Sequence, residues 1–372
     1  MRTVQHARRV AENPVAPQVG DELKTVSDVV RRVSAGGERG KSRSMTELGY
    51  SLSSEEHDAA TLVENARAAE KAGFTFALVS DHFHPWIDKQ GHSPFVWSVI
   101  GAIARETESL RLGTGVTCPL IRIHPAIVAQ AAATSAALMP GRFFLGVGTG
   151  ENLNEHILGD RWPAPDERLE MLEEAIELMR ELWKGEKTTF RGKHYTVEGA
   201  RIYTLPDEPP PIAVAAAAPK AAELAGRLGD AFVGVAPDSD LIGKFEQGGG
   251  EGKPCYGQLT VCWAEDEKEA LETAYEWWPN VGLEGNLTQE LPLPEHFEQA
   301  SATVRKEDVA EAIPLGPDPQ PYADGIQEYI DAGYDHVYLH QIGPEQEGFL
   351  RFYAEEVAPK VLGVREGALT GR

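Results

Sequence analysis

The stretch Val79-Ser80-Asp81-His82-Phe83-His84-Pro85-Trp86 decides how this chain is expected to fold. An apolar run over residues 74–79 ends abruptly in an acid, two histidines, a proline and a tryptophan. This change indicates a buried strand that carries titratable side chains to a mouth, which is where chemistry sits in a barrel of alternating strands and helices. A polar loop with one capping aspartate explains the segment equally well when it is taken alone. The later strands therefore have to decide between the two interpretations.

Outward from this stretch, the chain repeats a short apolar run, a polar break and an amphipathic helix. Strands are predicted at residues 48–52, 74–79, 110–116, 142–147, 211–216, 231–235, 259–264 and 336–340. Helices are predicted at residues 58–72, 97–107, 125–138, 167–184, 219–228, 267–277 and 347–361, with a hairpin over 190–205. The alternation predicts a (β/α)8 TIM barrel. An open doubly wound sheet is the alternative, but no glycine fingerprint follows the first strand.

The parts outside this rhythm divide the chain into a domain and its extensions. Residues 1–44 hold nine basic and five acidic side chains and include a Gly/Ser-rich linker, so we expect a disordered extension, with a start codon assigned too early as one explanation. The barrel domain is expected over 45–363, followed by a tail at 364–372. Within the domain, 246–254 is predicted to be a flexible loop. The proline-rich residues 278–321 are predicted to be an insertion of the kind that forms a lid or a substrate wall.

Composition excludes several classes of function. The net charge of −23 over 372 residues argues against general binding to nucleic acid or to anionic membranes, which needs a basic face. No run of 18 apolar residues occurs, so we expect no membrane-spanning helix. Three scattered cysteines, Cys118, Cys255 and Cys262, are too few for a disulfide framework or a closed zinc site. A reducing cytoplasm is the expected location.

If the strands form one barrel, the residues that follow them meet at its carboxyl-terminal mouth. The polar and aromatic members of this set are Glu55 after the first strand, Asp81, His82, His84 and Trp86 after the second, Thr117 and Cys118 after the third, and Thr149, Glu151 and Asn154 after the fourth. A histidine between carboxylates in a semi-enclosed mouth is a candidate acid/base set. No Gly-x-Ser-x-Gly nucleophile motif occurs. The small residues of 215–218 would let a flat or phosphorylated ligand approach the main chain.

Four motifs together resemble the luciferase-like, deazaflavin-dependent oxidoreductases. They are Ser80-Asp81-His82-Phe83-His84-Pro85-Trp86, Gly91-His92-x-Pro94-Phe95, Leu112-Gly113-Thr114-Gly115-Val116, and the run from Phe144 to Glu155 with Gly148-Thr149-Gly150-Glu151. Within that group the chain is most similar to the glucose-6-phosphate dehydrogenases that use coenzyme F420. The resemblance covers residues 45–362 and none of 1–44.

The resemblance implies hydride transfer between an alcohol or carbonyl substrate and F420. Catalytic roles fall on His82 as the base for the hydroxyl proton, Glu55 as the carboxylate that orients it, Trp86 beside the reacting face, and Glu151 as the acid that protonates the reduced ring. Cofactor contacts are implied for Asp81, Gly115, Val116, Cys118, Gly148, Thr149, Asn154, Ala217 and Ala218. The resemblance also implies a non-proline cis peptide at Gly115-Val116. A base and an acid beside a flat electron acceptor suit this chemistry.

The chain departs from the resemblance where the family holds the sugar phosphate. The family's threonine and cationic residues are replaced here by the substrate-pocket positions Val235, Asp238, Thr260 and Ala312. Charge-assisted hydrogen bonds are worth about 1.5–3 kcal/mol each, so their loss predicts that glucose 6-phosphate is not the substrate. A small neutral alcohol, aldehyde or ketone is expected instead. The family's glycine pair near the cofactor phosphate is replaced by Ala217-Ala218.

Three other functions stay open at this point. The nearest is a luciferase-like monooxygenase that uses FMN and oxygen. The spacing His82-x-His84, with His336 and His340 on the last strand, also suggests a metal-dependent hydrolase, although strands five and six add no ligand. The third is a non-catalytic flavin-binding relative. Members of the resembling family are usually homodimers, so we expect a homodimer that binds small molecules.

Overall fold

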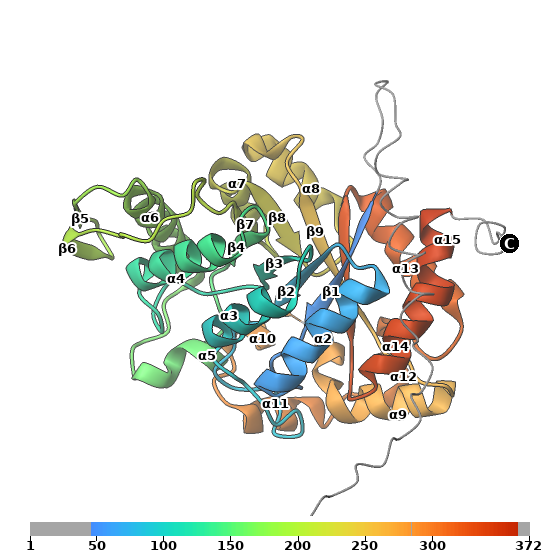
Figure 1. The fold of residues 1–372 in the computed structure, drawn as a ribbon. Coiled ribbons are helices and arrows are strands. Elements are labelled where there is room, and N and C mark those ends of the chain that lie inside the picture. Colours follow the sequence, from blue (N-terminus) through green and yellow to red (C-terminus); the bar gives the residue numbers. More distant parts are fainter. Residues whose placement is uncertain (1–45, 284, 364–372) are drawn as a thin grey trace, which may run out of the picture.

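A computed structural model describes residues 46–283 and 285–363, and its strands close into a barrel (Figure 1). The eight parallel strands are hydrogen-bonded in the order β1-β10-β9-β8-β7-β4-β3-β2. Their bounds are β1 Glu47–Leu52, β2 Phe76–Val79, β3 Arg111–Thr114, β4 Phe143–Val147, β7 Ile212–Ala215, β8 Ala231–Gly234, β9 Cys255–Val261 and β10 His336–Gln341. The predicted (β/α)8 barrel is confirmed.

Helices surround the strands as an outer layer (Figure 1). Those that follow barrel strands are α2 Ala59–Ala72, α3 Val96–Glu106, α4 Pro125–Leu138, α6 Pro165–Trp183, α7 Pro219–Leu228, α8 Ser239–Phe245, α9 Glu267–Trp277, α13 Pro319–Ala332, and α14 Gln346–Phe352 running through a π-helical turn into α15 Ala358–Leu362. Local chemistry sets several ends: Asp58 accepts from the Thr61 amide at the start of α2, and Gly73 ends that helix at φ 96°.

Shorter elements fill the connections. They are α5 Asn152–Glu155, the hairpin strands β5 Thr188–Arg191 and β6 Thr196–Ala200, and α10 Leu287–Glu290, α11 Pro294–Ser301 and α12 Lys306–Ala312 between α9 and α13. The predicted hairpin is therefore present. Where the structure describes it, the predicted insertion at 278–321 holds a 3-10 turn at Pro279–Gly282 and the helices α10, α11 and α12, and its last residues already belong to α13, a helix that the sequence interpretation missed.

The predicted flexible loop at 246–254 is wrong in its first half. Residues 246–250 continue α8 as a π-helical turn packed against α7. A Cβ at Gly248 would lie 2.4 Å from the Glu223 carbonyl oxygen, and one at Gly226 would lie 2.1 Å from the Phe245 carbonyl oxygen. The glycines therefore permit close backbone packing and do not form a linker. Strand β9 begins at Cys255, four residues before the predicted start at 259.

The strand register decides which side chains enter the barrel. Phe76, Tyr256 and Tyr338 cluster inside it, and side chains alternate in and out along each strand. Two residues further along β10 from Tyr338, His340 points inward, and it pairs in register with Thr260 of β9. Both side chains therefore point into the barrel close to its carboxyl-terminal mouth.

Two further predictions concern the whole chain. In the part that the structure describes, no helix is long and apolar enough to cross a membrane. The three cysteines are unpaired and buried. The predictions for residues 1–44 and 364–372 lie outside the described residues.

Candidate active site

The centre of the site is a buried carboxylate–histidine pair. Glu55 follows β1 and His82 follows β2, and Glu55 Oε1 lies 3.3 Å from His82 Nε2, with side chains 4% and 9% exposed. Ser80 and Ser53 donate to Glu55 Oε2 over 2.6 and 3.1 Å. Burial pushes the pKa of Glu55 upward, but the neighbouring His82 and the Ser80 hydroxyl outweigh it and leave the pKa below its ordinary value. Glu55 is therefore a charged partner for His82 at neutral pH.

The second ring nitrogen of His82 is fixed by the main chain. His82 Nδ1 lies 3.1 Å from the His84 carbonyl oxygen. A carbonyl can only accept, so Nδ1 carries hydrogen, and Nε2 is the ring nitrogen that faces the Glu55 carboxylate. The Trp86 ring lies 5.0 Å from the His82 ring, and Phe297 of α11 packs edge-on against Trp86. The insertion thus covers one side of this pair.

The short helix α5, which follows β4, is hydrogen-bonded to the loop that carries His82. Asn154 of α5 accepts from the amides of Phe83 and His84 over 2.8 and 3.2 Å, and donates to Glu151 Oε2 over 3.3 Å. Glu151 is thereby brought to the same end of the barrel as His82. His84 turns away, because its Nδ1 meets the Leu153 carbonyl at 2.9 Å.

Asp81 lies in a buried ionic network that sequence reasoning did not foresee. Its two carboxylate oxygens bind Arg122 at 2.9 Å and Thr117 at 2.7 Å, and Arg122 also meets Glu155 at 3.3 Å. All three charged side chains are nearly inaccessible. Asp81 is therefore engaged in supporting the loops, and its carboxylate is not free in the mouth. The sequence contained a hint of this network, because two carboxylates that become buried, Asp81 and Glu155, require a cationic partner.

One side of the mouth is built from main chain and small residues. A Cβ at Gly146 would lie 1.9 Å from the Thr114 carbonyl oxygen, and one at Gly148 would lie 2.9 Å from Val116 Cγ2. The Gly115–Val116 peptide is cis, as the resemblance implies. Cys118 is buried against Gly150, and burial raises the pKa of its thiol well above the usual value, so it is not a thiolate. The two glycines therefore let β4 pack closely against the end of β3, and the Cys118 thiol on this side is not a nucleophile in its protonated form.

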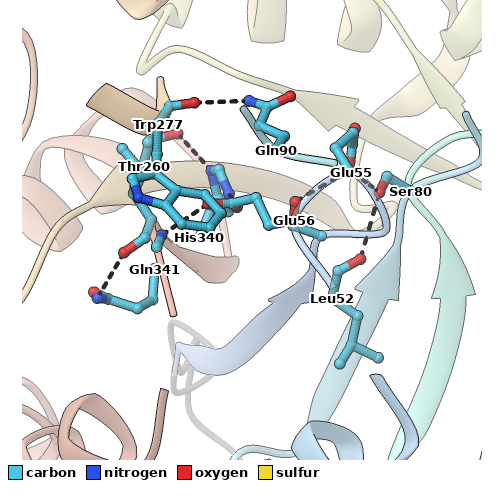
Figure 2. Close-up of polar contacts among 12 residues, drawn as sticks. Leu52, Glu55, Glu56, Ser80, Gln90, Thr260, Trp277, His340 and Gln341 are labelled. Atoms are coloured by element: carbon cyan, nitrogen blue, oxygen red, sulfur yellow. Dashed lines mark hydrogen bonds and ion pairs between the residues drawn. The ribbon is translucent and has the colours of Figure 1, made fainter. Parts of the chain in front are cut away.

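The opposite side holds a second carboxylate–histidine pair (Figure 2). His340 Nε2 lies 3.0 Å from Glu56 Oε2, and the two side chains are 2% and 0% exposed. Thr260 Oγ1 lies 3.5 Å from His340 Nδ1. The edge of the Trp278 ring packs against His340 at 4.5 Å, and Gln90 bridges the Trp86 amide and the Trp277 carbonyl. Glu56 and Gln90 were missed by the sequence analysis.

The remaining predicted residues lie at the ends of other elements. Ala217 and Ala218 are exposed ahead of α7, and Val235 is 65% exposed after β8. Asp238 accepts from the amides of Asp240 and Leu241 and so caps α8. Thr149 is half-buried before α5, while Ala312 is exposed at the end of α12, with no contact that joins it to His82.

Two further observations bear on the location of the site. Within residues 46–283 and 285–363, no three His, Cys, Asp or Glu side chains are grouped so that they could hold a metal. A hollow of about 740 Å³ opens where Arg111, Arg142, Phe143 and Tyr256 lie, at the amino-terminal ends of the strands. Its arginines are engaged, because Arg111 pairs with Glu47 and Arg142 donates to Thr107 and the Leu110 carbonyl. The Glu55–His82 and Glu56–His340 pairs lie at the carboxyl-terminal ends of the strands, so we place the candidate site there and not in this hollow.

Comparison with known proteins gives consistent matches. The sequence profile described as luciferase-like monooxygenase matches residues 42–336. The F420-dependent glucose-6-phosphate dehydrogenase of Mycobacterium avium (strain 104) is 37% identical over 328 residues, covering 84% of this chain and 97% of its own. The F420-dependent glucose-6-phosphate dehydrogenase 2 of Rhodococcus jostii (strain RHA1) matches equally well, at 37% identity and the same coverage.

Two solved structures share the fold over most of the chain. An F420-dependent secondary alcohol dehydrogenase in complex with an F420-acetone adduct has a TM-score of 0.79 at 30% identity, covering 85% of this chain and 99% of its own. The coenzyme F420 dependent tetrahydromethanopterin reductase from Methanopyrus kandleri has a TM-score of 0.69 at 22% identity, covering 85% of this chain and 99% of its own.

Proposed function

This chain belongs to the luciferase-like monooxygenase family, and we propose that it is an F420-dependent oxidoreductase that acts on a small neutral alcohol or carbonyl compound. The single observation that carries this proposal is the buried Glu55–His82 pair, whose atoms lie 3.3 Å apart at the mouth of the barrel. It supplies a base for a hydroxyl proton next to a wall suited to a flat ring.

The residues of the mouth fit a flat, phosphorylated cofactor. At Gly146 and Gly148 a Cβ would collide with Thr114 or Val116, so the strand ends pack closely there, and we propose that a planar ring lies on the main chain that follows them. Ala217 and Ala218 lead into α7, whose first amides lack helical partners and suit a phosphate group. Gly115, Val116, Cys118, Thr149 and Asn154 complete the proposed cofactor contacts.

The protein's part in the reaction is proton handling and positioning. When bound, the deazaflavin ring accepts or returns the hydride of the substrate carbon. His82 takes the hydroxyl proton at Nε2 as the C–H bond breaks, and the charge of Glu55 stabilises the imidazolium that forms. Trp86 and the insertion keep water from this pair. Glu151, held by Asn154, provides the second proton-transfer group on the cofactor side.

The charge distribution supports a neutral substrate and argues against glucose 6-phosphate. Arg122 is the cation among the site residues described above, and Asp81 and Glu155 occupy its guanidinium. Positions Val235, Asp238, Thr260 and Ala312 offer no positive charge, and Glu56 adds a buried carboxylate close by. A dianionic phosphate would meet negative groups without a compensating cation. The similarity to sugar-phosphate dehydrogenases therefore extends to the cofactor more readily than to the substrate.

Cofactor and substrate can be tested separately. Titration of the protein with F420 and with FMN should show tighter binding of F420. Tryptophan fluorescence can follow the binding, because Trp86 lies beside His82. Tighter binding of FMN, together with oxygen consumption, would identify a monooxygenase instead. Turnover is then followed by the loss of F420 absorbance with 2-propanol and with glucose 6-phosphate. Efficient oxidation of the sugar phosphate would overturn the substrate assignment.

We also propose that the enzyme is a cytoplasmic homodimer. Three unpaired, buried cysteines suit a reducing compartment. Light scattering coupled to size exclusion would test the dimer, and a mass equal to one chain would contradict it.

A further inference from the structure

Three side chains on the β9–β10 side of the mouth form a hydroxyl–imidazole–carboxylate chain that the reaction described above does not use. Thr260 Oγ1 lies 3.5 Å from His340 Nδ1, and His340 Nε2 lies 3.0 Å from Glu56 Oε2 (Figure 2). Glu56 and His340 are buried, whereas Thr260 is only half-buried. This series of hydrogen-bonded groups therefore runs from an inaccessible carboxylate to a half-buried hydroxyl at the mouth.

The donor and the acceptor of each hydrogen bond among Glu56, His340 and Thr260 can be assigned. Glu56 Oε1 accepts the Gly343 amide at 2.7 Å and Oε2 faces His340, so the carboxylate acts as acceptor on both oxygens. His340 Nε2 then carries the hydrogen, which leaves Nδ1 as the acceptor for the Thr260 hydroxyl. Gln258 Nε2 donates to the same hydroxyl at 3.5 Å. Thr260 thus donates its hydroxyl hydrogen to His340, and its remaining lone pair can accept a hydrogen bond from a ligand.

These three residues lie near the Glu55–His82 pair at the same end of the barrel. Glu55 and Glu56 are consecutive in the turn after β1. The Trp278 ring lies 4.5 Å from His340 and 6.5 Å from Trp86, and Trp86 lies 5.0 Å from His82. On this wall the half-buried Thr260 hydroxyl offers an acceptor, to which a hydroxyl group of a substrate can donate.

We propose that Glu56 and His340 are positioning residues that hold the Thr260 hydroxyl as an acceptor for a second hydroxyl group of the substrate. The substrate class is then a neutral alcohol with at least two hydroxyl groups, such as a vicinal diol or a polyol. The inference rests on the proposed function, since it assumes that the first hydroxyl is deprotonated by His82. A single neutral hydrogen bond is worth about three- to tenfold in affinity.

The test compares 2,3-butanediol with 2-butanol, which has the same carbon skeleton and one hydroxyl fewer. With F420-loaded protein, the diol should show a KM about three- to tenfold lower than 2-butanol at a similar kcat. Thr260→Val should remove this preference, and Thr260→Ser, which keeps the hydroxyl, should restore it. Affinity for F420, measured by fluorescence, should change by less than about twofold in both variants, because Thr260 lies opposite the cofactor wall.

Glu56→Gln gives a readout that a merely structural role would not move. A glutamine amide can donate to His340 Nε2, so Nδ1 would carry the hydrogen and donate to Thr260. The Thr260 hydroxyl would then donate to the ligand. Both the diol and 3-methoxy-2-butanol can accept that hydrogen bond, so the variant should bind the two alike, whereas wild type should favour the diol about three- to tenfold.

Two failures can be told apart. If F420 binds but no alcohol is oxidised, the proposed function is wrong, and equilibrium binding of the two alcohols to the loaded protein, followed by tryptophan fluorescence, still decides the inference. If wild type binds diol and mono-alcohol alike, or if Thr260→Val keeps the preference for the diol, the role given to Glu56 and His340 is wrong.

Discussion

Glu55 and His82 come from adjacent barrel strands and face each other with Oε1 and Nε2 3.3 Å apart. Strands β1 and β2 pair in register from Gly49 with Phe76 to Leu52 with Val79, so both residues leave the sheet at the same height. The two side chains are almost inaccessible, and their interaction is therefore weakly screened by water. This relationship joins the fold to the chemistry.

Replacing Glu55 by glutamine should lower kcat by about 10²-fold, because the imidazolium formed at His82 would lose its compensating charge. The dissociation constant for F420, measured by tryptophan fluorescence, should change by less than about twofold. Glu276→Gln is the matched control, since its carboxylate is 60% exposed and pairs with Lys89. Equal losses in kcat and cofactor affinity, with a lower melting temperature, would assign Glu55 a structural role instead.

The variant Arg122→Met should lower the free energy of unfolding by about 3–5 kcal/mol, because it leaves the buried carboxylates of Asp81 and Glu155 without a counter-charge. Urea denaturation followed by circular dichroism measures the change. Arg180→Met removes an exposed ion pair with Asp230 and should cost less than about 1 kcal/mol. Similar costs for the two variants would show that the Arg122 network adds nothing beyond a surface pair.

Stability should depend on pH through Glu47 and His336 at the other end of the barrel. The hydrogen bond from His336, helped by Arg111, lowers the pKa of Glu47 from 4.5 to about 2. Burial alone would lower the pKa of His336, but Asp335 and Glu47 outweigh it and raise the pKa above 6.5. The contribution of Glu47 is lost as the pH falls from 4.5 towards 2, and that of His336 is lost as the pH rises through its raised pKa.

Glu47→Gln should therefore destabilise the protein most between pH 4.5 and 6.5, the ordinary pKa values of the two groups. The expected loss is about 1 kcal/mol, since the Glu47 side chain is partly exposed and screened by solvent. Urea midpoints measured across this range test the prediction. A difference between variant and wild type that stays constant from pH 4 to pH 8 would contradict it.

Gly146→Ala should destabilise the barrel by about 1–3 kcal/mol or more, because the added Cβ would lie 1.9 Å from the Thr114 carbonyl oxygen and the backbone would have to move. Gly101→Ala is the control: it lies within α3 with open space around its Cβ, and should stabilise by about 0.5–1 kcal/mol. Thermal denaturation compares them. A stable Gly146→Ala variant with unchanged F420 affinity would mean that the cofactor wall is not as tight as described.

The order and type of most elements could be predicted from local patterns. The helix bounds at 125–138, 219–228 and 267–277 agree with α4, α7 and α9 residue for residue. Such helices carry their own start and stop signals, including a proline in the first turn of α4 and α7. The turn at 246–250 was misjudged because glycine marks both a flexible linker and a close backbone approach, and only the position of α7 distinguishes them.

The residues of the candidate site could also be predicted only in part from the sequence. That Glu55, His82 and Glu151 belong to one mouth follows from their places at strand ends. That Asp81 is occupied by Arg122, and that Glu56 reaches His340 across 284 positions of the chain, does not follow from any local pattern. Such partners depend on side-chain directions in the closed barrel, to which sequence spacing gives no access.

The sequence by itself determined the alternating order of strands and helices and the polar residues that end each strand, because periodicity and capping act over a few neighbouring residues. Only the tertiary structure decided the strand register and the pairing of buried charges. Those choices depend on which groups lose their water together when the barrel closes, and a buried charge keeps only the partner that closure brings within reach.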